Sequence, residues 1–421
     1  MRLIFIFLFL SGIAFSQSLI LKNVTVIPVN HDVVITNCNV YIRNEKIEKI
    51  EAFATKQVMK GYTVIDCSGK YLVPGLADMH AHFPDKDSPI KLQEYLRLNL
   101  AAGVTTLRSM RGEAGHLALR DSVILGKKIA PEIYVSYIFP TRDTLLTKDS
   151  IEKIVVCAKS KKYDFIKYLG GINETNFNYL IESCKKNEFP IAGHAYKSLP
   201  RSIEAGFTSV EHYQPLLSAY QKDSLNFKRI LEDMKVKGIA FCPTLSFYHI
   251  FSFEFPEKVL LERKGMEYVS AKVKSEWLKE YNDALKSTKD KLKDDFKIKY
   301  LDVYQAQFAK FNKLFKQAVG AGVLVLLSPD DGIFNVPGFG MYEEMKLYKN
   351  AGLSNYQILK CATLNAAIYF KQQKQWGSVE VGKKANLLLL NANPLENIEN
   401  IKQVEGTLLN GKYYSQKELL K

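Results

Sequence analysis

The stretch YLVPGLADMHAHF, residues 71–83, decides the fold of this chain. It begins with an apolar run typical of a buried strand, and Pro74-Gly75 follow. His80 and His82 then stand two residues apart. Side chains alternate between the two faces of a strand, so both imidazoles point to one side and can reach one metal ion. The plainer interpretation is a pair of histidines that only satisfy hydrogen bonds, and the rest of the chain makes it less favoured.

The segments on either side of the central region share one pattern. Residues 17–70 alternate apolar and polar side chains between turn residues, which predicts β-strands. The same alternation returns in residues 372–421, for example in WGSVEVGKKANLLLLNANP. We therefore expect the two ends of the chain to build one small β-sandwich domain together.

Residues 71–371 repeat a rhythm in which a short apolar stretch precedes an amphipathic helical stretch. The strand candidates are residues 71–82, 103–110, 132–139, 164–170, 190–196, 207–213, 238–245 and 323–331. Eight such units are what a (β/α)8 barrel requires, so the predicted fold class is α/β with a TIM-like barrel. Residues from about 254 to 320 are too long for one barrel helix and are charged with helical periodicity, which predicts an inserted helical lobe.

The net charge of +14 raises the question of a nucleic-acid partner. The lysines are interleaved with acidic residues, as in KDKLKDDFKIKY at 289–300, and this is typical of a solvated helix surface. We therefore expect no nucleic-acid partner. The six cysteines are widely and irregularly spaced without a CxxC pair, so we expect mostly buried thiols, and one disulfide is left open.

The first 16 residues are typical of a secretory signal peptide. Arg2 precedes an apolar stretch, and Ala14 stands at the −3 position of a cut after Ser16. The alternative is an uncleaved membrane anchor, but the apolar stretch is short for a span. The pattern predicts a secreted or periplasmic protein with no stable membrane insertion after cleavage.

Ionisable residues gather at the ends of the predicted strands, where a barrel of this class carries its chemistry. They are His80, His82, Lys167, His194, His212 and Asp330. The chain has only seven histidines, and four of them fall at strand ends. Imidazoles with a carboxylate suit zinc, or less specifically manganese, iron or cobalt. A charged Lys167 beside metal ions would be repelled, whereas its neutral amine can add carbon dioxide and become an anionic carbamate. Composition alone favours a plain surface lysine.

Taken together, these motifs resemble the amidohydrolase superfamily, and within it the imidazolonepropionase-like and prolidase-like metal-dependent hydrolases. VPGLADMHAH resembles the family's PGLIDxHxH, and DFIKYLG resembles the strand of its carboxylated lysine. IAGHAY and SVEHY resemble the two later histidine motifs, and LLSPDDG stands in place of GTDAG. ATLNAA and WGSVEVGKKANLLLLNANPLENI resemble the C-terminal signature, so the resemblance covers nearly the whole chain after the leader.

The resemblance implies a ligand set. His80, His82 and Asp330 would hold the more buried metal, and His194 and His212 would hold the second. Lys167, as a carbamate, would bridge two zinc ions, so zinc and carbon dioxide are the expected cofactors. Asp331 is the alternative to Asp330 as the ligand.

The implied activity is hydrolysis of a C–N bond in an amide, peptide or cyclic amide by a metal-activated hydroxide. Asp330 would move the proton to the leaving nitrogen as the catalytic acid and base. Relatives often carry a substrate-binding histidine after the third strand, where this chain has YIFPTRDT. We therefore interpret Arg142, together with Tyr196, as a contact to a small-molecule substrate.

Two other readings of the function remain open at this point. One is a mononuclear deaminase or an imidazolonepropionase-type ring-opening hydrolase, with Lys167 unmodified. The other is a catalytically inactive exported binding protein. The sequence leaves open the identity of the substrate and whether the chain forms a homo-oligomer.

Overall fold

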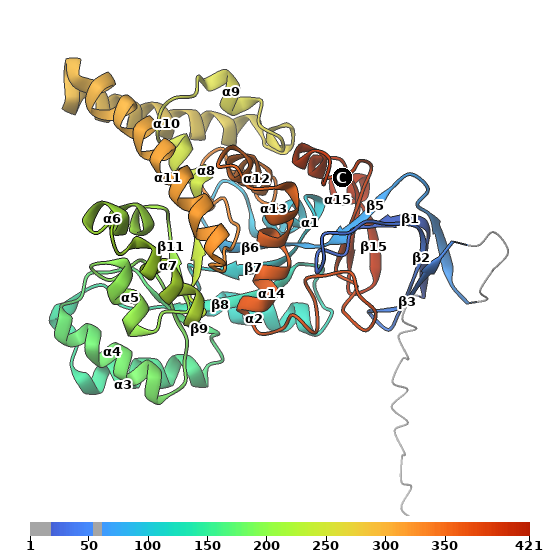
Figure 1. Cartoon of the computed structure of the whole chain (residues 1–421), viewed down its shortest axis with the longest axis horizontal. Coiled ribbons are helices and arrows are strands. Elements are labelled where there is room, and N and C mark those ends of the chain that lie inside the picture. The colour runs from blue at the N-terminus through green and yellow to red at the C-terminus, as the bar shows by residue number, and fades with distance from the viewer. Residues whose placement is uncertain (1–17, 54–60) are drawn as a thin grey trace, which may run out of the picture.

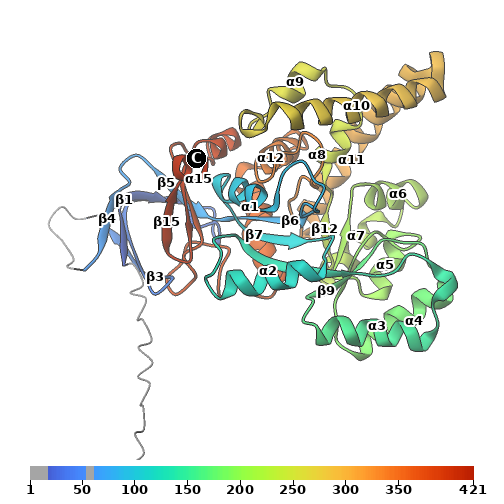
Figure 2. The same cartoon turned by 180° about the vertical axis from the view of Figure 1, so that it is seen from behind.

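The structure is a computed structural model that describes residues 18–53 and 61–421 (Figure 1). The predicted signal peptide, residues 1–16, lies outside the described residues. Figures 1 and 2 show a barrel at the centre of the molecule, with a small sheet on one side. Two long helices, α10 and α11, project from the barrel on the other side.

Seven parallel strands form the wall of the barrel in the order β12-β11-β10-β9-β8-β7-β6. They are β6 (Leu76–Ala81), β7 (Val104–Ser109), β8 (Glu132–Ile138), β9 (Phe165–Tyr168), β10 (Ile191–Gly193), β11 (Ser209–Glu211) and β12 (Ala240–Cys242). An eighth segment, residues 323–327, closes the wall. It pairs with β12 through a bridge between Phe241 and Val325, and Met79 N of β6 donates to Leu327 O over 3.2 Å. The predicted TIM-like barrel is confirmed.

Helices follow the strands and cover the outside of the barrel. They are α1 (Leu92–Ala101), α2 (Ala114–Ile124), α3 (Lys148–Ser160), α4 (Glu174–Lys186), α5 (Leu199–Ala205), α6 (Gln214–Lys222), α7 (Phe227–Val236), α12 (Gly340–Asn350), α13 (Asn355–Ala362) and α14 (Leu364–Tyr369). The side chains of Asn173 and Ser198 cap the first turns of α4 and α5. Such caps satisfy backbone N–H groups at the helix start, so these helices begin close behind the strand ends that carry the site.

The small sheet draws its strands from both ends of the chain, as the sequence predicts. The N-terminal part supplies β1 (Leu19–Val26), β2 (Ile35–Arg43), β3 (Lys46–Ala52), β4 (Thr63–Asp66) and β5 (Tyr71–Pro74). The C-terminal part supplies β13 (Leu387–Leu390), β14 (Val404–Leu409) and β15 (Lys412–Ser415), and α15 (Gln416–Leu419) follows. The order is β15-β14-β13-β5-β1-β2-β3, with β4 paired to β1. The sheet has an apolar core cluster of its own.

The segment 71–83 joins the two domains rather than forming one barrel strand. β5 pairs antiparallel with β13 and parallel with β1, so it belongs to the small sheet. The chain passes through Gly75 and enters the barrel as β6. The junction therefore lies at Gly75, a few residues beyond the expected boundary after residue 70. A Cβ atom at Gly75 would lie 2.3 Å from Thr105 Oγ1, so only glycine fits this crossing.

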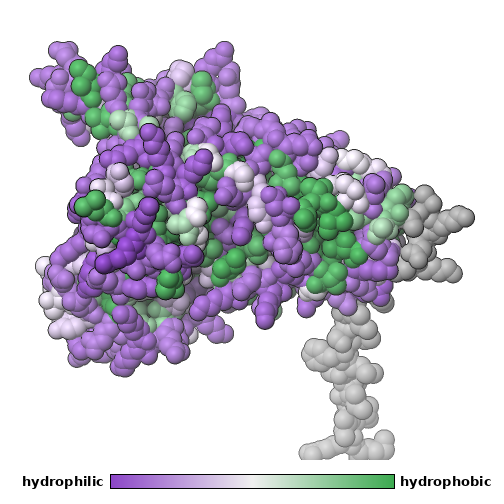
Figure 3. Space-filling view, viewed as in Figure 1, coloured by the Kyte–Doolittle hydropathy of each residue, from purple (hydrophilic) through white to green (hydrophobic). Residues whose placement is uncertain are grey.

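The predicted helical lobe is present between β12 and the eighth segment. It contains α8 (Leu245–Ile250), α9 (Glu257–Leu261), α10 (Ala271–Leu292) and α11 (Asp302–Ala321). Helix α11 buries Phe308, Phe311 and Phe315, and so also covers the barrel. The projecting part of α10 and α11 is largely hydrophilic (Figure 3), as expected for a solvated arm. In the described part of the chain, no helix combines the length and the apolar character that a membrane crossing needs. All six cysteines are free thiols.

Candidate metal centre

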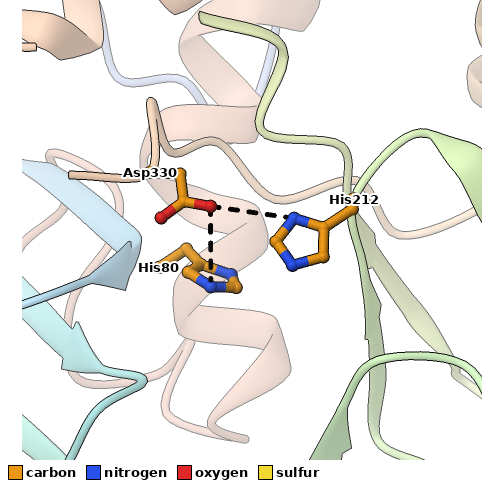
Figure 4. Close-up of side chains that lie close together, drawn as sticks. All are labelled: His80, His212 and Asp330. Carbon is orange, nitrogen blue, oxygen red and sulfur yellow. Dashed lines mark ion pairs between the residues drawn. The ribbon is translucent and has the colours of Figure 1, made fainter. Parts of the chain in front are cut away.

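The six predicted ligands come together at the carboxyl end of the barrel. Asp330 links three of the others: its Oδ2 lies 4.0 Å from His80 Nε2 and 3.7 Å from His212 Nδ1 (Figure 4). Its Oδ1 lies 3.6 Å from His82 Nε2. Lys167 Nζ lies 3.4 Å from His80 Nε2. The ring centroids of His194 and His212 are 4.9 Å apart. His80 and His82 belong to β6 and its end, and the other four side chains come from four further strands or strand ends, so the barrel brings them together.

Two of these residues have a backbone conformation that is unusual for a side-chain-bearing residue. His212 has φ 71° and Asp330 has φ 59°. Such left-handed conformations cost free energy and persist only where the surroundings enforce them, often at functional sites. For His212 the consequence is direct. Adjacent residues of a strand face opposite sides, but this turn allows both Glu211 and His212 to face the inside of the barrel.

The imidazoles are held in the neutral form that donates a lone pair to a metal. Burial, together with the nearby Lys167 charge, holds the pKa of His80 well below its ordinary value. Removal from water likewise lowers the pKa of His82 to about 3. His80 Nδ1 lies 2.8 Å from Glu211 Oε2, and His194 Nδ1 lies 3.0 Å from Leu169 O. Because both partners accept, these Nδ1 atoms carry the proton, and each Nε2 presents its lone pair.

Lys167 and Asp330 also have pKa values that differ from their ordinary values. Burial lowers the pKa of the Lys167 amine to about 8 and raises the pKa of Asp330 to about 8. The charge of Lys167 opposes the second shift, while Asp78 and Glu211 add to it. A bound divalent cation would compensate the charge of a carboxylate buried among neutral imidazoles. The donor set therefore fits divalent metal, and the readily neutralised Lys167 amine fits carbamate formation.

Of the two adjacent aspartates, Asp330 faces the histidines and Asp331 does not. Asp331 Oδ2 accepts hydrogen bonds from His82 N and from Tyr95 Oη, each over 2.7 Å. Its carboxylate therefore ties the end of β6 to helix α1. This geometry supports Asp330 over the alternative as the ligand.

The sequence-based reasoning missed two charged residues inside the barrel, Arg108 and Glu211. Both are completely buried, and Arg108 Nη2 donates to Glu211 Oε1 over 2.9 Å. The available signal was an acidic residue within a buried strand, directly before the histidine of SVEHY. It was missed because alternation along a strand predicts that neighbours of an inward-facing residue point outward.

Two cavities border the candidate ligands from different sides. The first, of about 520 Å³, is lined by His194 and His212 and by Lys197, Gln214 and Tyr248. The second, of about 470 Å³, contains His82 and Arg111. Its wall is completed by three side chains of helix α10: Glu276, Trp277 and Glu280. The inserted lobe thus forms part of the surroundings of the site.

The two predicted substrate contacts do not line either cavity. Tyr196 is buried, and its ring stacks on Phe177 with 3.7 Å between the centroids. The prediction assumed that Tyr196 lies on the same strand face as His194, but β10 ends at Gly193 and the alternation ends with it. Arg142 is exposed in the loop between β8 and α3.

Comparison with known proteins agrees with this architecture. The amidohydrolase family matches residues 71–413, and the chain belongs to this family of hydrolases. Enzymes of this family hydrolyse C–N bonds, and this chain is therefore a hydrolase that acts on C–N bonds. No curated protein matches the sequence.

Several solved structures share the fold at low sequence identity. A Xaa-Pro dipeptidase with bound methionine is 18% identical, with a TM-score of 0.68 over 95% of this chain and 100% of its own. The bottromycin amidohydrolase is 17% identical, with a TM-score of 0.73 over 96% and 88%. The ochratoxinase of A. niger is 18% identical, with a TM-score of 0.67 over 95% and 96%. These likenesses concern the fold.

Proposed function

We propose that this protein is an exported, metal-dependent amidohydrolase that holds two zinc ions and hydrolyses an amide, peptide or cyclic-amide bond. The observation that carries the proposal is the convergence of six ionisable side chains, Asp330 among them, at the carboxyl end of the barrel. His80, His82 and Asp330 would hold one ion, and His194 and His212 the other. The Lys167 carbamate would lie between them.

The chain's own residues supply the positioning and the proton transfers. Bound divalent metal ions would polarise the scissile carbonyl and lower the pKa of the attacking water. Asp330, with one oxygen toward His82 and the other toward His80 and His212, is placed to take the proton of that water. From this position Asp330 can hold the proton and return it to the leaving nitrogen as the general acid.

Lys167 would react with carbon dioxide before both metal ions are bound. Its neutral Nζ attacks the carbon of carbon dioxide, an N–C bond forms, and one proton leaves the nitrogen. The product is an anionic carbamate with two oxygens. Burial supports this step, because it lowers the pKa of the amine to about 8 and so raises the neutral fraction.

Small peptides and N-acyl amino acids are the proposed substrate class. Support comes from the structural neighbours, which include a Xaa-Pro dipeptidase and an amidohydrolase. The two cavities beside the ligands offer room for groups on both sides of a scissile bond. Export rests on the pattern of residues 1–16, and a mature N-terminus at Gln17, measured by mass spectrometry, would support it.

The decisive experiment loads the purified protein with zinc and assays it against dipeptides, N-acyl amino acids and lactams. Chelator-treated protein is the control. Metal analysis is run in parallel: about two ions per chain supports the binuclear site, whereas about one supports the mononuclear deaminase or ring-opening alternative. Zinc binding without turnover of any substrate would favour the binding protein.

A further inference from the structure

A buried ion pair crosses the inside of the barrel beneath the candidate ligands. Arg108 belongs to β7 and Glu211 to β11, two strands on opposite sides of the closed wall. Neither side chain is exposed to solvent. Removing two charges from water costs several kcal/mol per ion, and apolar residues of similar volume often stabilise a core as well or better. Such a pair therefore calls for a role beyond stability.

Arg108 uses its donors to hold two different parts of the site. Its Nη2 donates to Glu211 Oε1 over 2.9 Å, and its Nη1 donates to Ser209 Oγ over 2.8 Å. Its Nε donates to the carbonyl of Met79, the residue before His80, over 2.5 Å. The guanidinium thus fixes both the Glu211 carboxylate and the backbone from which His80 projects.

The other oxygen of Glu211 reaches His80 itself. Glu211 Oε2 lies 2.8 Å from His80 Nδ1. A carboxylate paired with a guanidinium acts as an acceptor, so His80 Nδ1 carries the proton and Nε2 presents its lone pair. This Nε2 atom faces Lys167 Nζ at 3.4 Å and Asp330 Oδ2 at 4.0 Å, where the ligands converge.

We propose that Glu211, held by Arg108, is a positioning residue that fixes the ring orientation and tautomer in which His80 presents Nε2 to a metal. The proposal rests on the proposed function, because it takes His80 to be a metal ligand. In this role Glu211 acts through His80 and is not itself a metal ligand. A metal-ligating histidine commonly donates its second N–H to a carboxylate in this way.

The neighbouring geometry also argues against Glu211 as a direct ligand. His80, Glu211 and Cys242 do place donor atoms close to one another. However, both Glu211 oxygens are already engaged, one by Arg108 and one by His80. A cation bound there would also be repelled by the guanidinium 2.9 Å from Glu211 Oε1.

The test uses the full-length protein with Glu211→Gln. This isosteric change replaces the carboxylate that accepts from His80 and Arg108 with an amide. Chelator-stripped parent and variant are titrated with zinc against a chromophoric chelator. We expect the tightest zinc affinity of the variant to fall roughly 10- to 100-fold. Nitrogen-15 spectra of the metal-free histidines provide a second readout: we expect Nδ1-protonated His80 in the parent and loss of that single tautomer in the variant.

Asp164→Asn is the matched control. Asp164 is also a carboxylate paired with an arginine, since Arg120 Nη1 lies 3.0 Å from its Oδ2, but it stands before β9 at the other end of the barrel. This control should lose stability without a change in zinc affinity or in the His80 tautomer. Unchanged zinc affinity and tautomer in Glu211→Gln would overturn the positioning role alone. A parent that binds no zinc would overturn the proposed function and this proposal with it.

Discussion

The side-chain amide of Asn335 donates a hydrogen bond to the backbone carbonyl of Asp330 over 3.0 Å. The same nitrogen lies 3.1 Å from Pro329 O, and Asn335 Oδ1 accepts from the hydroxyl of Ser246 over 2.7 Å. Asn335 is almost fully buried. It therefore clamps the turn in which Asp330 adopts its left-handed backbone conformation. The lobe reaches the same clamp through Arg263, whose Nη1 lies 3.4 Å from Asn335 Oδ1.

Replacing Asn335 by alanine should reduce activity more than a comparable buried substitution does. Two buried carbonyls lose their donor, so the free energy of unfolding should fall by about 1–3 kcal/mol. A displaced Asp330 should lower kcat by about 10- to 100-fold. Asn365→Ala is the control, because Asn365 Nδ2 also donates to a buried carbonyl, Val325 O, over 2.8 Å. Equal losses of kcat in the two variants would contradict the clamp.

The two adjacent aspartates should behave differently on conversion to asparagine. Asp330→Asn removes the carboxylate that faces the histidines, and kcat should fall by roughly 10²- to 10⁴-fold, the usual contribution of a general acid and base. Asp331→Asn alters only the contacts to His82 N and Tyr95 Oη, so its main effect should be lower stability. Steady-state kinetics and zinc content per chain measure the difference. A larger kinetic loss in Asp331→Asn would reverse the assignment.

Zinc loading should depend on carbon dioxide through Lys167. Burial lowers the pKa of its amine to about 8, so the neutral fraction that adds carbon dioxide grows as the pH rises from 6 to 9. Zinc uptake by the stripped protein should increase with bicarbonate over that range, and Lys167→Gln should abolish the dependence. Protein incubated with ¹³C-bicarbonate should show a carbamate carbon signal by NMR. Lys383→Gln, at another buried lysine, should keep this signal.

A histidine outside the metal centre should make the fold sensitive to acid. His249 packs on Phe308 with 4.4 Å between ring centroids, and its Nδ1 has no hydrogen-bond partner among the described residues. Burial, with a smaller effect of the Arg263 charge, lowers the pKa of His249 to about 4 from an ordinary value of 6.5. Between pH 4 and 6.5 the unfolded chain binds more protons than the folded chain, so stability falls as the pH falls through this window.

His249→Phe should remove that part of the pH dependence. At pH 5 the contribution to the free energy of unfolding is roughly 2 kcal/mol relative to pH 8. Denaturant unfolding of chelator-treated parent and variant at both pH values measures it. His31→Phe, at an exposed histidine, is the control and should retain the behaviour of the parent. Identical pH dependence in parent and His249→Phe would show that the ring is not the cause.

The ligand set was predictable from the sequence wherever a strand stays regular up to the ligand. β6 runs to Ala81, so the alternation in DMHAH holds and His80 and His82 both face Asp330. The same rule failed for Tyr196, because β10 ends before His194. Glu211 was not predicted, because the inward orientation of its neighbour, His212, depends on a positive φ that the local sequence does not indicate.

The division of the segment 71–83 between two sheets was likewise not predictable from the sequence. Its apolar run suits a buried strand in either sheet, and the partners that decide between them are distant in sequence. Pro74-Gly75 was the only local mark of the switch. The reason that Gly75 is required, a close approach to Thr105, is a tertiary contact.

The pairing of β5 with β13 has a consequence for how the molecule is made. A ribosome delivers residues 71–74 roughly 300 residues before their partners at 387–390, so the whole barrel is synthesised between them. One edge of β5 therefore stays unpaired while the barrel is synthesised. Pairing it with β13 closes a very long loop, which is slow. The segment that leads into the strand carrying His80 is paired on both edges only after β13 has been made, so a nascent chain that stops before β13 lacks the support on which the site depends.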